Sequence, residues 1–160
     1  MSRLFGDWDR VEDIFDKFRH DYVKNIRDVL ERAVAKDIKI KLKDNVIKQL
    51  LNLAPLSPEY RERKRSEGLD IRTLIATGEY INSLQVEKVE ETADSVIFFI
   101  GATEGMHHSG LTFAELSEII EYGTSTQPPR PHIRMTWEMI KGEVESKVVQ
   151  ILESELFKRI

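Results

Sequence analysis

The sequence of 160 residues contains no cysteine. This absence excludes disulfide bonds, thiolate zinc sites, iron–sulfur clusters and a cysteine nucleophile. Packing of apolar side chains must therefore hold the fold together. A chain of this length can bury most of its apolar side chains around one core, and we expect a single domain over residues 1–160.

Long apolar runs are also lacking. No window approaches the roughly 20 apolar residues that span a bilayer, and residues 1–7 lack the apolar stretch of a signal peptide. We expect no membrane partner and a cytosolic product or a particle component. The formal net charge of -4 argues against a general attraction to nucleic acid, although a local basic patch could still contact phosphates.

Catalytic motifs are absent from the sequence as well. It has no Gly-x-Ser-x-Gly elbow, no lysine-bearing phosphate loop and no His-Glu-x-x-His pattern. Of the four histidines only His107 and His108 are adjacent, and adjacent side chains tend to point apart. We expect no enzymatic activity and no cofactor. The alternative is a small metal-dependent hydrolase or nuclease that uses His107, His108 and nearby carboxylates.

Apolar residues at steps of three and four predict a long amphipathic helix at each end of the chain, over about 9–36 and 133–156. The first of these could protrude as residues 1–36. Alternating polar and apolar residues over 37–42 indicate a break near 37–44, after which a second helix runs to about Leu53.

Three shorter elements are marked by local signals. Ser57 followed by Pro58 is typical of a helix start and predicts a short helix to about Ser66. Thr112 with Glu115 forms a capping-box pattern for a helix to about Ile120, and Gly123 stands where a C-terminal glycine would. A loop over 124–131, stiffened by three prolines, precedes the last helix.

Residues that favour strands occupy 81–89 and 95–100, joined by a polar connection of hairpin length. The run 96–100 is apolar on both faces, so we expect helices or a neighbouring subunit to cover both. A two-stranded hairpin is marginal alone, which predicts a third strand from 37–42 or 69–76, or sheets that join between subunits. The expected class is α+β, with the terminal helices packed on a small antiparallel sheet with its hairpin at about 81–100.

Positive charge is concentrated only at Arg61, Arg63, Lys64 and Arg65. Cations at the C-terminal end of a short helix complement its dipole, so a solvated helix face explains this cluster. The alternative is a patch that contacts DNA, as in a DNA-binding regulator that uses residues 61–65.

Four segments carry a family resemblance. Leu56-Ser57-Pro58-Glu59-Tyr60 and Leu74-Ile75-x-Thr77-Gly78-x-Tyr80-x-x-Ser83-Leu84 resemble motifs of the phage virion-morphogenesis and tail-completion proteins. Ile119-Ile120-Glu121-Tyr122-Gly123-Thr124 and Pro129-Arg130-Pro131-His132-Ile133-Arg134 are similar to the signature that precedes the last helix of that family. Order and spacing both fit over residues 56–160. The departures are Tyr80 where the family usually has Leu, His132 where it usually has Phe, and an insertion-like stretch at 104–111.

The resemblance implies a structural virion protein of the head–tail connector, located in the neck or tail and assembled in the host cytoplasm. The family forms rings, often of six subunits, that join the DNA-filled head to the tail. The implied partners are other copies of the chain, the portal or adaptor protein, and the tail terminator or tail tube, with nonspecific contact to channel DNA. The residues expected to make these contacts are Arg61, Arg63, Lys64, Arg65, Gly123, Thr124, Arg130 and Arg134.

Overall fold

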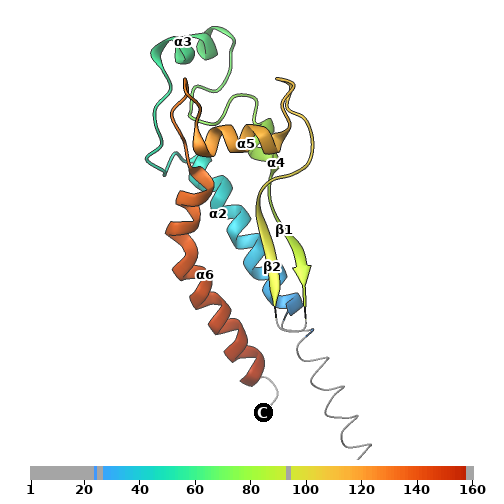
Figure 1. Ribbon diagram of the computed structural model, residues 1–160. Coiled ribbons are helices and arrows are strands. Elements are labelled where there is room, and N and C mark those ends of the chain that lie inside the picture. Colours follow the sequence, from blue (N-terminus) through green and yellow to red (C-terminus); the bar gives the residue numbers. More distant parts are fainter. Residues whose placement is uncertain (1–23, 25–26, 93–94, 158–160) are drawn as a thin grey trace, which may run out of the picture.

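The computed structural model describes residues 24, 27–92 and 95–157, and its architecture is α+β (Figure 1). The predicted class is therefore confirmed, whereas most of the predicted helix over 9–36 lies outside the described residues. In chain order the elements are η1 (Glu31–Ala35), α2 (Lys36–Ile47), α3 (Pro58–Ser66), α4 (Glu79–Ser83), β1 (Leu84–Glu91), β2 (Val96–Ala102), α5 (Phe113–Tyr122) and α6 (His132–Phe157).

The predicted break near 37–44 is wrong, because η1 and α2 form one continuous helical segment. Ile38 and Leu42 are buried four positions apart, whereas Ile40 between them is 48% exposed. Their spacing fits both a strand and a helix, so the short alternating window could not decide between them. The helix also ends at Ile47 rather than near Leu53.

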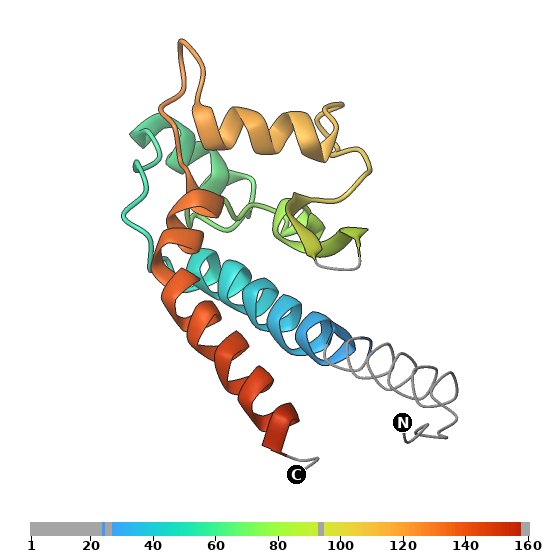
Figure 2. The same cartoon turned by 60° about the horizontal axis from the view of Figure 1, so that its bottom comes forward.

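The long C-terminal helix α6 confirms the prediction for 133–156. Its 26 residues span about 39 Å at 1.5 Å per residue. Figures 1 and 2 show α6 beside α2, with the hairpin on the other side of α2. Val34, Ile38 and Ile140 form the buried centre of this contact, and Val144 and Val148 extend it along α6.

Strands β1 and β2 pair antiparallel in a two-stranded sheet, from Leu84 opposite Ala102 to Glu91 opposite Val96. The predicted hairpin is confirmed, although residues 81–83 belong to α4 and the first strand begins later than predicted. The predicted third strand is wrong for both candidate segments. Residues 37–42 are helical, and 69–76 contain no strand.

One face of the hairpin is open to solvent. Ile97 and Phe99 are 47% and 46% exposed, while Phe98 and Ile100 alternate with them on the more buried face. The expectation that helices cover both faces is thus wrong for the described part of the chain. Coverage by a neighbouring subunit stays a prediction.

The local helix signals are confirmed in atomic detail. Thr112 Oγ1 accepts from the Glu115 backbone N–H at 3.2 Å, and the Glu115 carboxylate accepts from the Thr112 N–H at 2.9 Å. Ser57 Oγ accepts from the Tyr60 N–H at 3.2 Å, and Ser57 is the residue that caps the start of α3.

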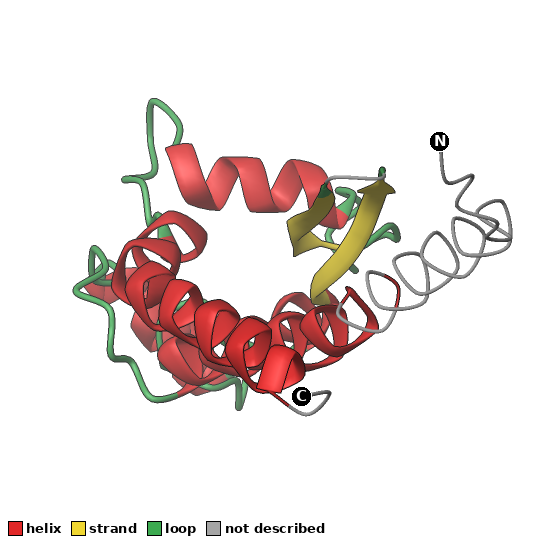
Figure 3. Cartoon of the chain, turned by 90° about the horizontal axis from the view of Figure 1, so that it is seen from below, coloured by secondary structure: helices red, strands yellow, loops and turns green. Residues whose placement is uncertain are grey.

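Seen from below, α5 and the α2–α6 pair lie on opposite sides of the molecule (Figure 3).

Candidate functional site

The segments that carry the family resemblance meet around one cavity of about 760 Å³. Apolar side chains such as Leu56, Leu74 and Leu116 form part of its wall. Arg63, Lys64 and Arg130 supply positive charge, and no acidic residue among those described lines it. The lining comes from 55–64, 74–80 and 116–130, together with His107, so folding gathers segments that are far apart in the sequence.

Arg130 lines this cavity and is buried instead of facing solvent. It is 6% exposed, and its guanidinium donates to the carbonyls of Ala54 at 2.8 Å and Pro55 at 2.9 Å. Burial lowers the pKa of Arg130 from its usual value. Arg130 was predicted to contact a partner, but in this structure it fastens the 124–131 loop to the segment before α3.

His132 is fully buried at the first position of α6. Its Nδ1 lies 3.1 Å from the Arg130 carbonyl and its Nε2 lies 2.9 Å from the Tyr80 hydroxyl. A carbonyl can only accept, so Nδ1 carries the proton of the neutral ring and Nε2 accepts from Tyr80. Burial lowers the pKa of His132 and raises that of Tyr80, so both side chains are neutral near pH 7.

Glu121, at the end of α5, caps the beginning of α6. Its two carboxylate oxygens accept from the backbone N–H groups of Arg134 at 3.0 Å and Ile133 at 3.2 Å. Oε2 also lies 3.4 Å from Nδ1 of His132. These N–H groups have no partner within their own helix, and the positive end of the helix dipole favours a carboxylate there. Glu121 belongs to the motif at 119–124, but no local sequence pattern predicts that its carboxylate caps α6.

Gly123 makes the sharp connection between α5 and α6 possible. Its backbone has φ 77° and ψ -175°, a conformation that essentially only glycine adopts. A Cβ there would lie 2.7 Å from the Gln127 carbonyl oxygen and 2.8 Å from the Pro129 nitrogen. Gly123 is therefore required for the fold, whereas two other predicted contact residues, Thr124 and Arg134, are exposed.

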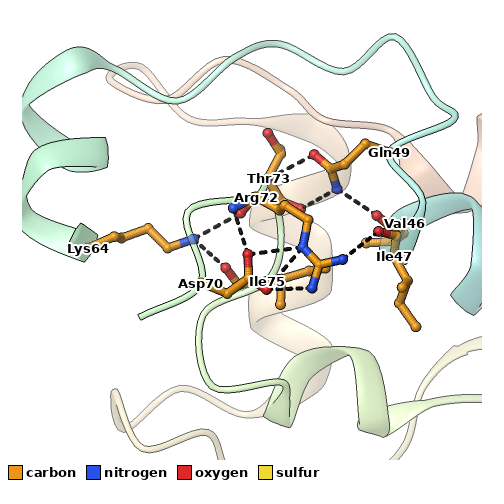
Figure 4. Close-up of polar contacts among 8 residues, drawn as sticks. All are labelled: Val46, Ile47, Gln49, Lys64, Asp70, Arg72, Thr73 and Ile75. Carbon is orange, nitrogen blue, oxygen red and sulfur yellow. Dashed lines mark hydrogen bonds and ion pairs between the residues drawn. The ribbon is translucent and has the colours of Figure 1, made fainter. Parts of the chain in front are cut away.

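The basic cluster on α3 does not form one exposed surface. Lys64 is 2% exposed, and its ammonium donates to the carbonyls of Arg72 at 2.9 Å and Ile75 (Figure 4). Burial lowers the pKa of Lys64. The prediction that Lys64 faces DNA is therefore wrong for this conformation.

The three arginines of the cluster remain exposed. Arg65 forms an ion pair with Glu62, and Arg63 Nε lies 3.9 Å from the Glu67 carboxylate. Such pairs offset part of the local positive charge but break easily in water. Contact of Arg61, Arg63 and Arg65 with DNA stays a prediction, and so does the regulator alternative that depends on it.

Side chains also hold the 67–78 loop against the end of α2 (Figure 4). Gln49 both accepts from the Thr73 N–H and donates to the Thr73 carbonyl, at 3.0 Å each. Arg72 donates to the Ile47 carbonyl at 2.8 Å and also forms an ion pair with Asp70. The hydrogen bond from the Arg72 side chain to the Asp70 carboxylate lowers the pKa of Asp70. Leu74 has a φ of 63° within this loop, so the contacts around it hold an unusual backbone conformation.

A second polar cluster joins α4 to the 103–112 loop. Oε2 of Glu79 lies 2.9 Å from Nδ1 of His108 and 3.7 Å from Nε2 of His107. The expectation that the adjacent histidines point apart is wrong, since their ring centroids lie 3.9 Å apart. The hydrogen bond from His108 lowers the pKa of Glu79, and burial lowers that of His107. The hydrolase alternative gains a ligand set from this geometry but stays a prediction.

The fold and site define an α+β protein whose motif segments are joined by a buried polar junction, formed by Tyr80, Glu121, Arg130 and His132. Comparisons with family models, curated proteins and solved structures gave no significant match. No helix among the described residues is long and apolar enough to cross a membrane.

Proposed function

We propose that the chain is a structural protein of the phage head–tail connector, without enzymatic activity, that acts in the neck or at tail completion. In this role identical subunits form a ring, of six subunits in the family it resembles, between the DNA-filled head and the tail. The observation that carries the proposal is the order and spacing of the motifs from Leu56 to Arg134, combined with their convergence around one junction.

The convergence supports the resemblance because the motifs are defined by sequence alone. Arg130 of the last motif binds the carbonyl of Pro55, next to the first motif. His132, also of the last motif, contacts Tyr80 of the second motif, 52 residues away. Chance matches in unrelated parts of a chain would have no reason to contact one another.

The two main departures from the family pattern also contact each other. Tyr80 stands where Leu is usual and His132 where Phe is usual, and the two side chains share a hydrogen bond of 2.9 Å. A buried apolar pair can be replaced by a buried polar pair when each new polar group finds a partner. The departures are therefore compatible with the family's packing and support the proposal.

A ring of identical subunits needs two different surfaces on each subunit. The open face of the hairpin carries the exposed apolar residues Val89, Ile97 and Phe99 and provides one surface. Glu87 and Glu90 pair opposite Phe99 and Ile97, so this surface is apolar and acidic together. Met139 and Val149 of α6 are also more than half exposed, on a different element. Because a two-stranded sheet is marginal alone, contact with a neighbouring subunit would stabilise the hairpin.

The proposal is tested by deleting the gene from the genome that encodes it and examining induced particles by electron microscopy. We expect DNA-filled heads without attached tails, and restoration of tailed particles by the wild-type gene supplied in trans. Normal tailed particles from the deletion strain would refute the proposal, and so would a genome that yields no tailed particles.

A pair of variants connects this test to the proposed ring surface. Ile97→Asp with Phe99→Asp places two charges on the open hairpin face and should prevent complementation while leaving the purified chain folded by circular dichroism. Glu118→Gln, an exposed position on α5, is the matched control and should complement fully. Full complementation by the hairpin variant would show that this face is not a contact surface.

A further inference from the structure

We propose that Glu79, His107 and His108 form a binding site for a divalent transition metal ion, with Zn²⁺ as the best fit. One ligand atom from each residue lies within 4.8 Å of the other two. This inference is independent of the proposed role in the head–tail connector, and the connector role does not require it.

The spacing of the ligand atoms fits a zinc ion. With bonds of about 2.0–2.1 Å and tetrahedral angles, ligand atoms around Zn²⁺ lie about 3.3 Å apart. Oε2 of Glu79 lies 2.9 Å from Nδ1 of His108 and 3.7 Å from Nε2 of His107. These two distances fall on either side of the ideal value, and all three ligand atoms lie within 4.8 Å of one another. Rotation of the two histidine side chains is the movement that would bring their nitrogens to the tetrahedral spacing.

The surroundings of His107 hold its ring in the orientation that a ligand needs. Nδ1 lies 2.8 Å from Ser109 Oγ and accepts from the Ser109 backbone N–H at 3.2 Å, so the proton of the neutral ring lies on Nε2, which faces Glu79. Metal binding at Nε2 requires the other tautomer, in which Nδ1–H donates to Ser109 Oγ. The ring also packs edge-on against Phe113, with 6.0 Å between centroids. A ring held on both sides loses little further freedom when a metal binds.

The chemistry of the ligands selects the class of ion. Two imidazole nitrogens and one carboxylate favour Zn²⁺, Co²⁺, Ni²⁺ or Cu²⁺ over Ca²⁺ and Mg²⁺, which prefer oxygen ligands. Three protein ligands leave a fourth position for water or for a group from another molecule.

Binding would also connect two parts of the chain. Glu79 opens α4, whereas His107 and His108 lie in the loop between β2 and α5. A ligand that binds only the folded state stabilises it by an amount that grows with its concentration. The metal should therefore raise the melting temperature of the chain, which gives a readout that needs no enzymatic assay.

Titration of the full chain, free of affinity tags and stripped with a chelator, tests the site. We expect one equivalent of Zn²⁺ by calorimetry, visible absorption typical of four-coordinate Co²⁺, and a higher melting temperature with either ion. No binding of Zn²⁺ or Co²⁺ at micromolar concentrations would overturn the proposal and leave the three side chains as a hydrogen-bonded cluster.

Variants separate this site from adventitious binding. His108→Gln changes a half-exposed side chain that should not be needed for folding, and we expect it to weaken Zn²⁺ binding at least about tenfold. Glu79→Gln should have a similar effect. Glu104→Gln, in the same loop and exposed, is the matched control and should bind as the wild type does. Unchanged binding by the double variant His107→Gln with His108→Gln would overturn the proposal.

Discussion

The Tyr80 hydroxyl lies 2.9 Å from Nε2 of His132, although 52 residues separate the two in the sequence. Tyr80 belongs to α4 and His132 to α6, so this contact joins the middle of the chain to the start of its last helix. Both side chains are buried, and Ser117 Oγ lies 3.1 Å from the same hydroxyl. The contact is thus part of the buried polar junction that holds the motif segments together.

A double-mutant cycle at these two positions tests whether the pair replaces an apolar one. Tyr80→Leu leaves Nε2 of His132 without its hydrogen bond, and His132→Phe removes a partner of the Tyr80 hydroxyl. Each single variant should lower the free energy of unfolding by about 1–3 kcal/mol, because a buried polar group loses its partner. The double variant should lose clearly less than the sum, which urea denaturation would measure.

Tyr60→Phe is the control for the loss of a tyrosine hydroxyl, because Tyr60 is 38% exposed. Its stability should stay within about 0.5 kcal/mol of the wild type. Strictly additive losses in the cycle would mean that the two positions do not act as a pair, and would weaken the support that they give to the family resemblance.

Stability should fall as the pH decreases below about 6.5, because burial holds the pKa of His132 below that value in the folded state. Below this pH the unfolded chain binds a proton that the folded chain does not. The free energy of unfolding therefore becomes smaller as the pH falls. The slope per group is at most about 1.4 kcal/mol per pH unit. Glu121 faces the ring and opposes the shift, while Tyr80 and the Arg130 carbonyl are its other polar neighbours.

Urea denaturation at several pH values between 7.5 and 5 measures this effect. His107 also has a lowered pKa and contributes in the same direction, so the comparison is made in a His107→Gln background. There the added pair Tyr80→Leu and His132→Phe should remove most of the remaining slope. An equal slope with and without His132 would contradict the prediction.

Local signals allowed much of the fold to be predicted from the sequence. Ser57, Thr112 and Gly123 act on residues within a few positions of themselves, so helix starts and stops could be recognised without knowledge of the fold. The long helix α6 repeats its apolar spacing over many turns, which makes the period clear. Over 37–42 the window was too short to distinguish the two periods, and the prediction was wrong.

The sites depend on contacts that no local pattern contains. Glu79 meets His108 across 29 positions in the sequence, and Glu121 caps a helix that begins beyond the next loop. Lys64 is buried because the carbonyls of Arg72 and Ile75 are turned toward it by a loop with a positive φ at Leu74. Its neighbours in the sequence are charged, so composition alone predicted an exposed side chain.

Lys64→Met tests the structural role of the buried lysine. The substitution keeps a long side chain but leaves the carbonyls of Arg72 and Ile75 without this donor, so we expect a loss of about 1–3 kcal/mol in the free energy of unfolding. Arg65→Met, at an exposed position paired with Glu62, should change stability by less than about 0.5 kcal/mol. Equal effects of the two substitutions would contradict the burial of Lys64.

Substitution of Gly123 and of Gly142 by alanine should change the stability of the protein in opposite directions. At Gly123 a Cβ would lie 2.7 Å from a backbone oxygen and 2.8 Å from a backbone nitrogen, and the φ of 77° is strained for any other residue. Gly123→Ala should therefore cost at least about 2 kcal/mol of stability.

Gly142 lies inside α6, where a methyl group would meet no atom within 4 Å beyond the backbone of its own helix. Gly142→Ala should therefore add about 0.5–1 kcal/mol of stability through helix propensity. Thermal and urea denaturation of both variants measure this contrast. A tolerated Gly123→Ala would mean that the α5–α6 connection can take another path, and that the junction built by Glu121, Arg130 and His132 does not depend on this turn.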